Sequence, residues 1–118
     1  MGKNKLTIDI EDYKGGTTTW WKHPLYTYTY TDGVKAIAED VGAYWLIDTV
    51  FSKQGNPELE NEPFQVWDWI VIDEKGRFIV SDGNGNVIAN YTVLFTDFPE
   101  GSFTFWFTDE VLLLPVEY

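Results

Sequence analysis

His23, in the stretch WWKHPLY, is the only histidine of the sequence and the first side chain suited to acid–base chemistry. One histidine and no cysteine exclude the usual multi-histidine and thiolate zinc sites. The serines are Ser52, Ser81 and Ser102, and none lies in a G-x-S-x-G nucleophile turn. We therefore expect His23 to pack or to cap the backbone, beside Trp20 and Trp21.

Oxygen-bearing side chains recur at alternate positions in DGNGN, residues 82–86, as they do in calcium loops. An EF-hand loop needs glycine at its sixth position and glutamate at its twelfth, and here these are Val87 and Val93. The stretch predicts a tight hairpin turn instead. The phosphate-binding motif G-x-x-x-x-G-K is also absent, so we expect neither a metal nor a cofactor.

Carboxylates near aromatic residues leave one catalytic alternative open. Paired carboxylates hydrolyse glycosides in other proteins, and sugars favour aromatic surroundings. Spacing in the sequence does not say whether two of these carboxylates converge. A small-molecule or carbohydrate-binding domain, or a weak hydrolase, is therefore the alternative function, and its candidate residues are Asp32, Asp48, Asp68 and Asp97.

The sequence is strongly acidic, with a net charge of −11. Phosphate backbones and anionic lipids would be repelled, so direct nucleic-acid and membrane binding are disfavoured. Arg77 is the last basic residue, and six carboxylates follow it. This asymmetry serves either solubility or a negative face that meets a basic protein partner.

Aromatic residues make up 18% of the chain and gather in TWW (19–21), in the alternating row around Tyr28, and in FTFWF (103–107). They either fill a thin core or form a recognition patch, since Trp and Tyr are enriched at interface hot spots. In the second case the acidic and aromatic residues predicted to contact a partner are Asp97, Glu100, Asp109, Glu110, Trp106, Tyr26 and Tyr28.

Hydrophobic periodicity predicts two helices, over about residues 33–41 and 43–53. Thr31 or Asp32 can cap the first, and Gly42 suits the left-handed residue that ends it. The second segment is apolar on nearly all sides, and its β-branched and aromatic content would also allow a strand. A further strand is expected over residues 25–31, where tyrosine and threonine alternate.

The second half of the sequence predicts an antiparallel meander of four or five strands, with the two helices packed on one face: an α+β fold. Strands are expected over 64–73, 77–82, 87–97, 103–107 and 111–114, with a turn at 74–76. The run VLLL at 111–114 is continuous and apolar, as in a strand covered on both faces. Residues 1–16 are expected to be a flexible polar arm and 17–118 a single domain. No stretch resembles a signal peptide or a membrane span, so a cytoplasmic location is expected.

The ordered motifs YWLID (44–48), FQVW (64–67), DGNG (82–85), TDFP (96–99) and LLLPVEY (112–118) resemble an uncharacterised family of small proteins from bacteria, phages and other mobile elements. The resemblance covers about residues 17–118. It implies a bacterial or phage context and an accessory function, and it assigns no catalytic or binding residue.

These observations together predict a non-enzymatic, acidic protein-binding module of bacterial or phage origin. Its most concrete form is an inhibitor of a host nucleic-acid-handling defence complex, similar to an anti-CRISPR protein. The expected partner is a protein, basic at its contact surface.

Overall fold

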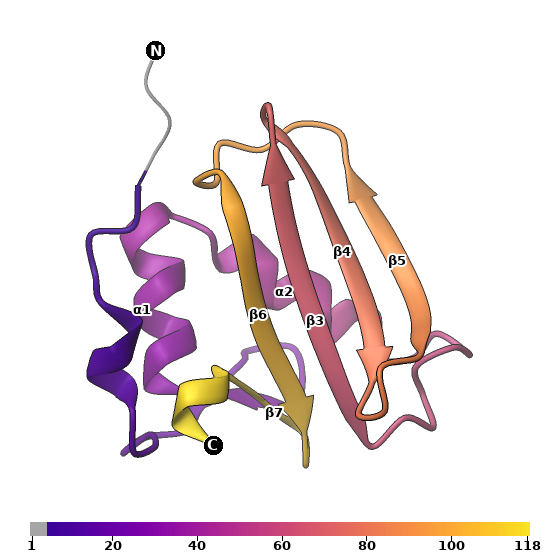
Figure 1. Ribbon diagram of the computed structural model, residues 1–118. Helices are drawn as coiled ribbons and strands as arrows, with labels where there is room; N and C mark the ends of the chain where they lie inside the picture. Colours follow the sequence, from indigo (N-terminus) through magenta and orange to yellow (C-terminus); the bar gives the residue numbers. More distant parts are fainter. Residues whose placement is uncertain (1–4) are drawn as a thin grey trace.

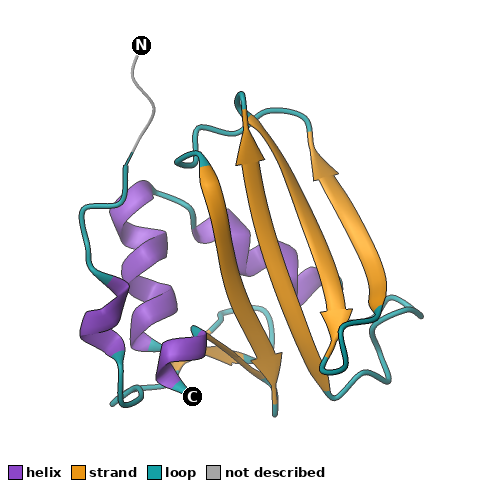
Figure 2. Cartoon of the chain, viewed as in Figure 1, coloured by secondary structure: helices purple, strands orange, loops and turns teal. Residues whose placement is uncertain are grey.

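The computed structural model describes residues 5–118 and has the α+β architecture that the sequence predicts. Two consecutive helices accompany a seven-stranded sheet whose long strands all follow them, in the second half of the chain (Figure 1). Both helices lie on the same side of the sheet (Figure 2). The predicted fold class is therefore confirmed.

The helices α1 (Asp32–Val41) and α2 (Tyr44–Ser52) lie within a residue or so of their predicted bounds. The side chain of Thr31 caps α1 by accepting a hydrogen bond from the amide of Val34. Gly42 ends α1 in the left-handed region, at φ 66°, where a residue without Cβ meets little strain. The helical interpretation of residues 43–53 is the correct one, because α2 buries four apolar side chains against the domain.

The sheet is built around a central antiparallel unit. β3 (Phe64–Ile72) pairs with β4 (Lys75–Asp82) on one edge and with β6 (Gly101–Thr108) on the other. β5 (Val87–Val93) follows β4, and β7 (Val111–Leu113) follows β6. The order is thus β1-β2-β7-β6-β3-β4-β5.

This order corrects one part of the sequence prediction, the meander. The second half contributes five strands, within the predicted four or five, and β1 and β2 from the first half extend the sheet to seven. The sheet is no simple meander, because β6 crosses over to β3 instead of pairing with β5. Strands adjacent in sequence pair often but not always. The alternation of residues 103–107, the fourth predicted strand, does not indicate whether this strand pairs with β3 or with β5.

Two short strands complete the sheet: β1 (Trp21–Lys22) and β2 (Thr29–Tyr30). β2 is parallel to β7, and the other pairings are antiparallel. The strand expected over 25–31 is therefore reduced to two residues. The preceding segment turns over α2 instead, because Tyr26 and Tyr28 pack edge-on against Phe51.

Two hairpin turns share the sequence Asp-Glu: Asp73-Glu74 between β3 and β4, and Asp109-Glu110 between β6 and β7. All four residues are left-handed, with φ of 52°, 64°, 52° and 63°, as in type I′ turns. The first turn therefore lies one residue before the predicted 74–76. Gly76 belongs to β4, where the indole of Trp69 covers it so closely that an added Cβ would lie 2.0 Å from Cη2.

The core lies between the helices and one face of the sheet. Leu112 and Leu114 are buried there, and Leu113, which alternates with Leu112 along β7, is also buried, as predicted for the Leu-rich run. The short 3-10 helix η2 (Pro115–Glu117) follows. The largest fully buried side chains include Trp67, Trp69, Phe51, Phe78, Phe98 and Phe105.

Residues 5–16 are joined to the domain instead of forming a separate arm. Leu6 and Ile8, which alternate in the sequence, pack against the core. The amide of Thr7 donates to the carboxylate of Asp40 at 2.7 Å. The 3-10 helix η1 (Ile10–Tyr13) comes next. Residues 5–16 of the expected arm thus make contacts with the domain, and residues 1–4 of it lie outside the described part of the chain.

Candidate functional site

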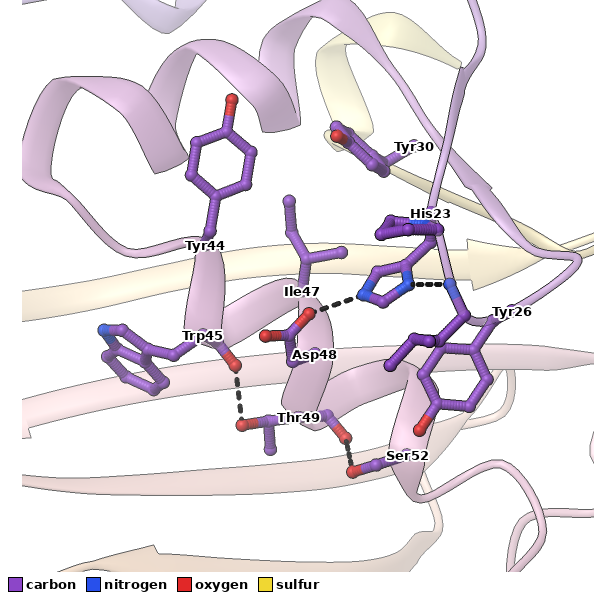
Figure 3. A pocket seen from close by; sticks show the side chains of 11 residues that line it. His23, Tyr26, Tyr30, Tyr44, Trp45, Ile47, Asp48, Thr49 and Ser52 are labelled. Atoms are coloured by element: carbon purple, nitrogen blue, oxygen red, sulfur yellow. Dashed lines mark hydrogen bonds and ion pairs between the residues drawn. The ribbon is translucent and has the colours of Figure 1, made fainter.

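A cavity of about 640 Å³ lies beside α2 and is called here the aromatic pocket (Figure 3). One wall is α2, where Tyr44, Asp48 and Ser52 recur every four residues and so share a face. The opposite wall is the loop between β1 and β2. The rings that line the pocket belong to His23, Tyr26, Tyr30, Tyr44 and Trp45.

Tyr30 and Tyr44 meet edge to face, with ring centroids 6.5 Å apart. Burial raises the pKa of both phenols, so they are neutral near pH 7. The Tyr44 hydroxyl donates to Glu39 at 2.9 Å, and the same carboxylate oxygen pairs with Lys35 at 2.7 Å. Lys35 is thus paired outside the pocket, and the ring of Tyr44 is held at its rim.

His23 and Asp48 form an acid–base pair inside the pocket. His23 Nε2 lies 2.5 Å from Asp48 Oδ1, and His23 Nδ1 accepts a hydrogen bond from the amide of Leu25 at 3.0 Å. An amide N–H can only donate, so this arrangement assigns the ring proton to Nε2, which donates to Asp48. The imidazole is then neutral and Asp48 keeps its negative charge. The side chain of His23 is 9% exposed, whereas that of Asp48 is 61% exposed.

This pair does not assemble a nucleophile with its base. Nδ1, the ring nitrogen with a lone pair, is occupied by the Leu25 amide. The two aliphatic hydroxyls of the pocket donate to helix carbonyls, Thr49 to Trp45 and Ser52 to Thr49, each at 2.9 Å. Neither hydroxyl is therefore positioned to transfer a proton to His23. The histidine instead packs and caps, against the rings of Tyr26 and Phe51 and not against Trp20 and Trp21.

A second concavity, of about 280 Å³, lies at the end of the sheet where β6 turns into β7. We call it the acidic groove. Its apolar floor includes Leu59 and Phe107, which are 1% and 6% exposed, with the ring of Tyr28 beside them. Within residues 5–118 its rim carboxylates take part in no ion pair. They are Glu60, Glu62, Asp109 and Glu110.

The acidic residues predicted to contact a partner do not share one face. Asp109 and Glu110 line the acidic groove together with Tyr28. Asp97 and Glu100 lie on the β5–β6 connection at the opposite end of the sheet, where Glu100 accepts a hydrogen bond from the amide of Asp73 at 2.7 Å (Figure 1). The expected single acidic face is therefore two acidic ends, because β6 runs the length of the sheet between them.

The aromatic residues predicted to contact a partner are half-buried by one another. Trp106 packs between Phe64 and Tyr118, with ring centroids 5.2 and 5.3 Å away. Tyr26 and Tyr28 stack at 6.0 Å. Most large rings thus serve the interior, which was one of the two explanations for the aromatic content, whereas Trp20 is 57% exposed.

The four aspartates considered for acid–base catalysis are scattered. Asp32 accepts hydrogen bonds from Thr18 and Trp21, and Asp68 from Thr104 at 2.7 Å. Asp48 and Asp97 line different cavities. Across residues 5–118, no three His, Asp or Glu side chains are grouped so that they could hold a metal ion. No helix in the same range is long and apolar enough to cross a membrane.

Residues 55–63 lie between α2 and β3 and carry Glu60 and Glu62, which the sequence motifs do not single out. The available signal was the pattern ELENE at 58–62, in which one leucine interrupts the acidic residues. Leu59 is buried and anchors the loop on the domain, which fixes the position of its acidic neighbours. A lone apolar residue in an acidic loop therefore indicated a docked loop.

Comparison with known families places the chain: it belongs to a family of unknown function, DUF6876, whose model matches residues 5–118. The match starts before the resemblance in the motifs, in agreement with the packing of Leu6 and Ile8. No curated protein and no solved structure gave a significant match. The family carries no activity with it, so a function has to be argued from the two concavities.

Proposed function

We propose that this protein is a non-enzymatic binding module that holds a basic protein partner in the acidic groove. The observation that carries the proposal is the set of four rim carboxylates, which surround an apolar floor and form no ion pair within residues 5–118. An arginine side chain suits both features. Its guanidinium binds carboxylates bidentately and stacks on rings such as that of Tyr28.

The net charge of −11 supports the same proposal, because a negative protein attracts a basic partner before contact and so speeds association. The lack of cysteine and the resemblance to proteins of bacteria, phages and mobile elements support a cytoplasmic setting in a bacterial host.

The test compares two variants of equal charge. The groove variant carries Glu60→Gln, Glu62→Gln, Asp109→Asn and Glu110→Gln. The control variant neutralises four carboxylates at the opposite end of the sheet, with Asp73→Asn, Glu74→Gln, Asp97→Asn and Glu100→Gln. Each variant changes the net charge from −11 to −7.

A fluorescent peptide of alternating arginine and leucine is titrated into each protein at about physiological ionic strength, where charges act over about 8 Å. The groove variant is expected to bind about tenfold more weakly than the control variant, a difference of about 1.4 kcal/mol. Equal binding by both variants would show that only net charge matters and would overturn the proposal.

In its most concrete form the partner is a nucleic-acid-handling defence complex, which this protein inhibits in the manner of an anti-CRISPR protein. Such complexes hold nucleic acid in positively charged channels, and an acidic protein competes for the same cations. The assay is displacement of a labelled oligonucleotide from a purified effector by the wild-type protein and by the groove variant. Displacement that the groove variant loses supports inhibition. An unchanged oligonucleotide complex, while the arginine peptide still binds, rejects inhibition and retains the binding module.

A further inference from the structure

The aromatic pocket contains an uncompensated negative charge. Asp48 Oδ1 accepts the proton of a neutral His23, and Asp48 Oδ2 has no hydrogen-bond partner within residues 5–118. The pocket lining contains no lysine or arginine, and Lys35 is paired with Glu39 outside it. The carboxylate, 61% exposed, therefore offers one oxygen to whatever enters.

Rings surround this charge. Tyr44 and Trp45 lie on one side of Asp48, and His23, Tyr26 and Tyr30 lie on the other, so that a group placed at Asp48 has rings on both sides (Figure 3). The face of a neutral phenol or indole attracts a cation through its quadrupole, by about 0.5–2 kcal/mol for each well-placed ring. Tyr30 and Tyr44 have this neutral form near pH 7, and burial raises the pKa of both phenols further.

The polar groups of the pocket disfavour a sugar. Both aliphatic hydroxyls, Thr49 and Ser52, already donate to backbone carbonyls of α2. His23 has its two nitrogens committed to Leu25 and Asp48. The open polar groups are the phenols of Tyr26 and Tyr30 and Asp48 Oδ2, which make no hydrogen bond within residues 5–118. A ligand with many hydroxyls would therefore regain only a few of the hydrogen bonds that it makes to water. An anion would be repelled by Asp48.

We propose that the aromatic pocket binds a small organic cation, an ammonium group with alkyl substituents. The ammonium lies beside Asp48 Oδ2 and its alkyl groups contact the rings of Tyr26, Tyr44 and Trp45. Weakly hydrated ammonium groups suit this site because their charge is satisfied by one carboxylate and several ring faces, without a set of hydrogen-bond acceptors. This site is separate from the acidic groove and does not depend on the function proposed for it.

The test uses choline as the probe and its neutral isostere, 3,3-dimethyl-1-butanol, as the matched control ligand. Both are titrated into the wild-type protein by calorimetry in about 0.15 M NaCl, which screens the general attraction of an acidic surface for cations. Choline is expected to bind with one-to-one stoichiometry and about tenfold or more above the isostere, the equivalent of about 1.4 kcal/mol. Equal binding of the two ligands, or no saturable binding of choline, would overturn the proposal without recourse to any variant.

Variants then locate the site. Asp48→Asn should weaken choline binding about tenfold, since it removes the charge and retains the shape. Glu11→Gln removes one negative charge from an exposed position on η1 and should leave choline binding unchanged. Tyr44→Leu should weaken binding severalfold while Tyr44→Phe retains it, because the ring face and not the hydroxyl makes the contact. Choline binding that Asp48→Asn and Tyr44→Leu leave intact places the cation elsewhere and rejects the proposal.

Discussion

The carboxylate of Glu117 accepts a hydrogen bond from the amide of Gly33, in the first turn of α1, at 2.9 Å. The other oxygen of Glu117 accepts from the hydroxyl of Thr31 at 2.5 Å and from the amide of Leu114 at 2.9 Å. One buried side chain thus satisfies a free N–H group at the N-terminus of α1 and places negative charge there, where the helix dipole favours it. The motif LLLPVEY is therefore structural: its leucines fill the core and its glutamate joins η2 to α1.

Replacing Glu117 with glutamine should destabilise the domain by about 1–3 kcal/mol. Both oxygens of the carboxylate accept hydrogen bonds, whereas the NH₂ group of glutamine cannot accept, so a buried donor loses its partner. Chemical denaturation measures the change. Glu11→Gln, at an exposed position on η1, is the control and should stay within about 0.5 kcal/mol of the wild type. If both substitutions have the same effect, the hydrogen bonds of Glu117 do not support the fold.

Gly76→Ala should destabilise the domain by about 2–4 kcal/mol, although alanine is usually the better strand residue. The new Cβ would lie 2.0 Å from Cη2 of Trp69, a fully buried ring that has no room to move away. Gly55→Ala is the matched control, since nothing lies within 4 Å of the Cβ that it adds. The thermal midpoints of the two variants provide the comparison, and a Gly76→Ala midpoint at or above that of Gly55→Ala would contradict the close packing.

Asp32 should make the stability depend on pH on the acid side. Its carboxylate accepts hydrogen bonds from the amide and hydroxyl of Thr18 and from the indole of Trp21, each at 2.9 Å, and these lower its pKa to about 2. An aspartate in the unfolded chain has a pKa of about 3.9. Because the folded value is the lower one, the stabilisation is complete above the unfolded pKa and is lost as the pH falls towards 2.

The wild type should therefore be more stable than Asp32→Asn at about pH 6, and the gap between their urea midpoints should narrow between about pH 4 and pH 2.5. Asp12→Asn removes an exposed carboxylate on η1 and should show no such narrowing. A gap for Asp32→Asn that stays constant over this range would mean that the Thr18 and Trp21 contacts do not favour the charged form.

The two helices and the long strands were predictable because their signals are local. Thr31 and Gly42 mark the ends of α1 through their own side chain and backbone. Strand order was not predictable in this way. β6 lies inside the sheet, where it pairs with β3 on one edge and β7 on the other, and its pairing with β3 joins segments 30 or more residues apart. The strand prediction for residues 25–31 was mostly wrong for a related reason. Tyr26 and Tyr28 alternate as strand residues do, but their rings pack on Phe51 of α2 and not on a neighbouring strand.

The candidate sites were less accessible to sequence reasoning. His23 and Asp48 stand 25 residues apart, and only the turn of the chain over α2 brings them together. The residues after Arg77 are acidic in the sequence but do not form one acidic surface, because Asp97 and Asp109 lie at opposite ends of β6. Net charge and aromatic content are properties of the whole sequence, whereas a binding site depends on which charged and aromatic residues share one surface.

Substitutions in the two Asp-Glu turns can distinguish an effect on stability from an effect on binding. Glu110 and Glu74 occupy equivalent left-handed positions, at φ 63° and 64°, where a side chain is strained by about 1 kcal/mol and glycine is not. Glu110→Gly and Glu74→Gly should therefore each stabilise the domain by about 0.5–1 kcal/mol, whereas Glu110→Gln, which keeps the Cβ, should not.

Binding of the arginine peptide should follow a different pattern. Glu110 lines the acidic groove and Glu74 does not, so Glu110→Gly and Glu110→Gln should both weaken binding, by an amount typical of one partly exposed charge pair, about 0.5–1 kcal/mol. Glu74→Gly should bind as the wild type does. Denaturation midpoints and peptide titrations of the three variants check both patterns together. Stabilisation by Glu74→Gly without stabilisation by Glu110→Gly would contradict the equivalence of the turns. Peptide binding that is unchanged in both Glu110 variants would instead remove Glu110 from the contact surface while leaving the strain argument intact.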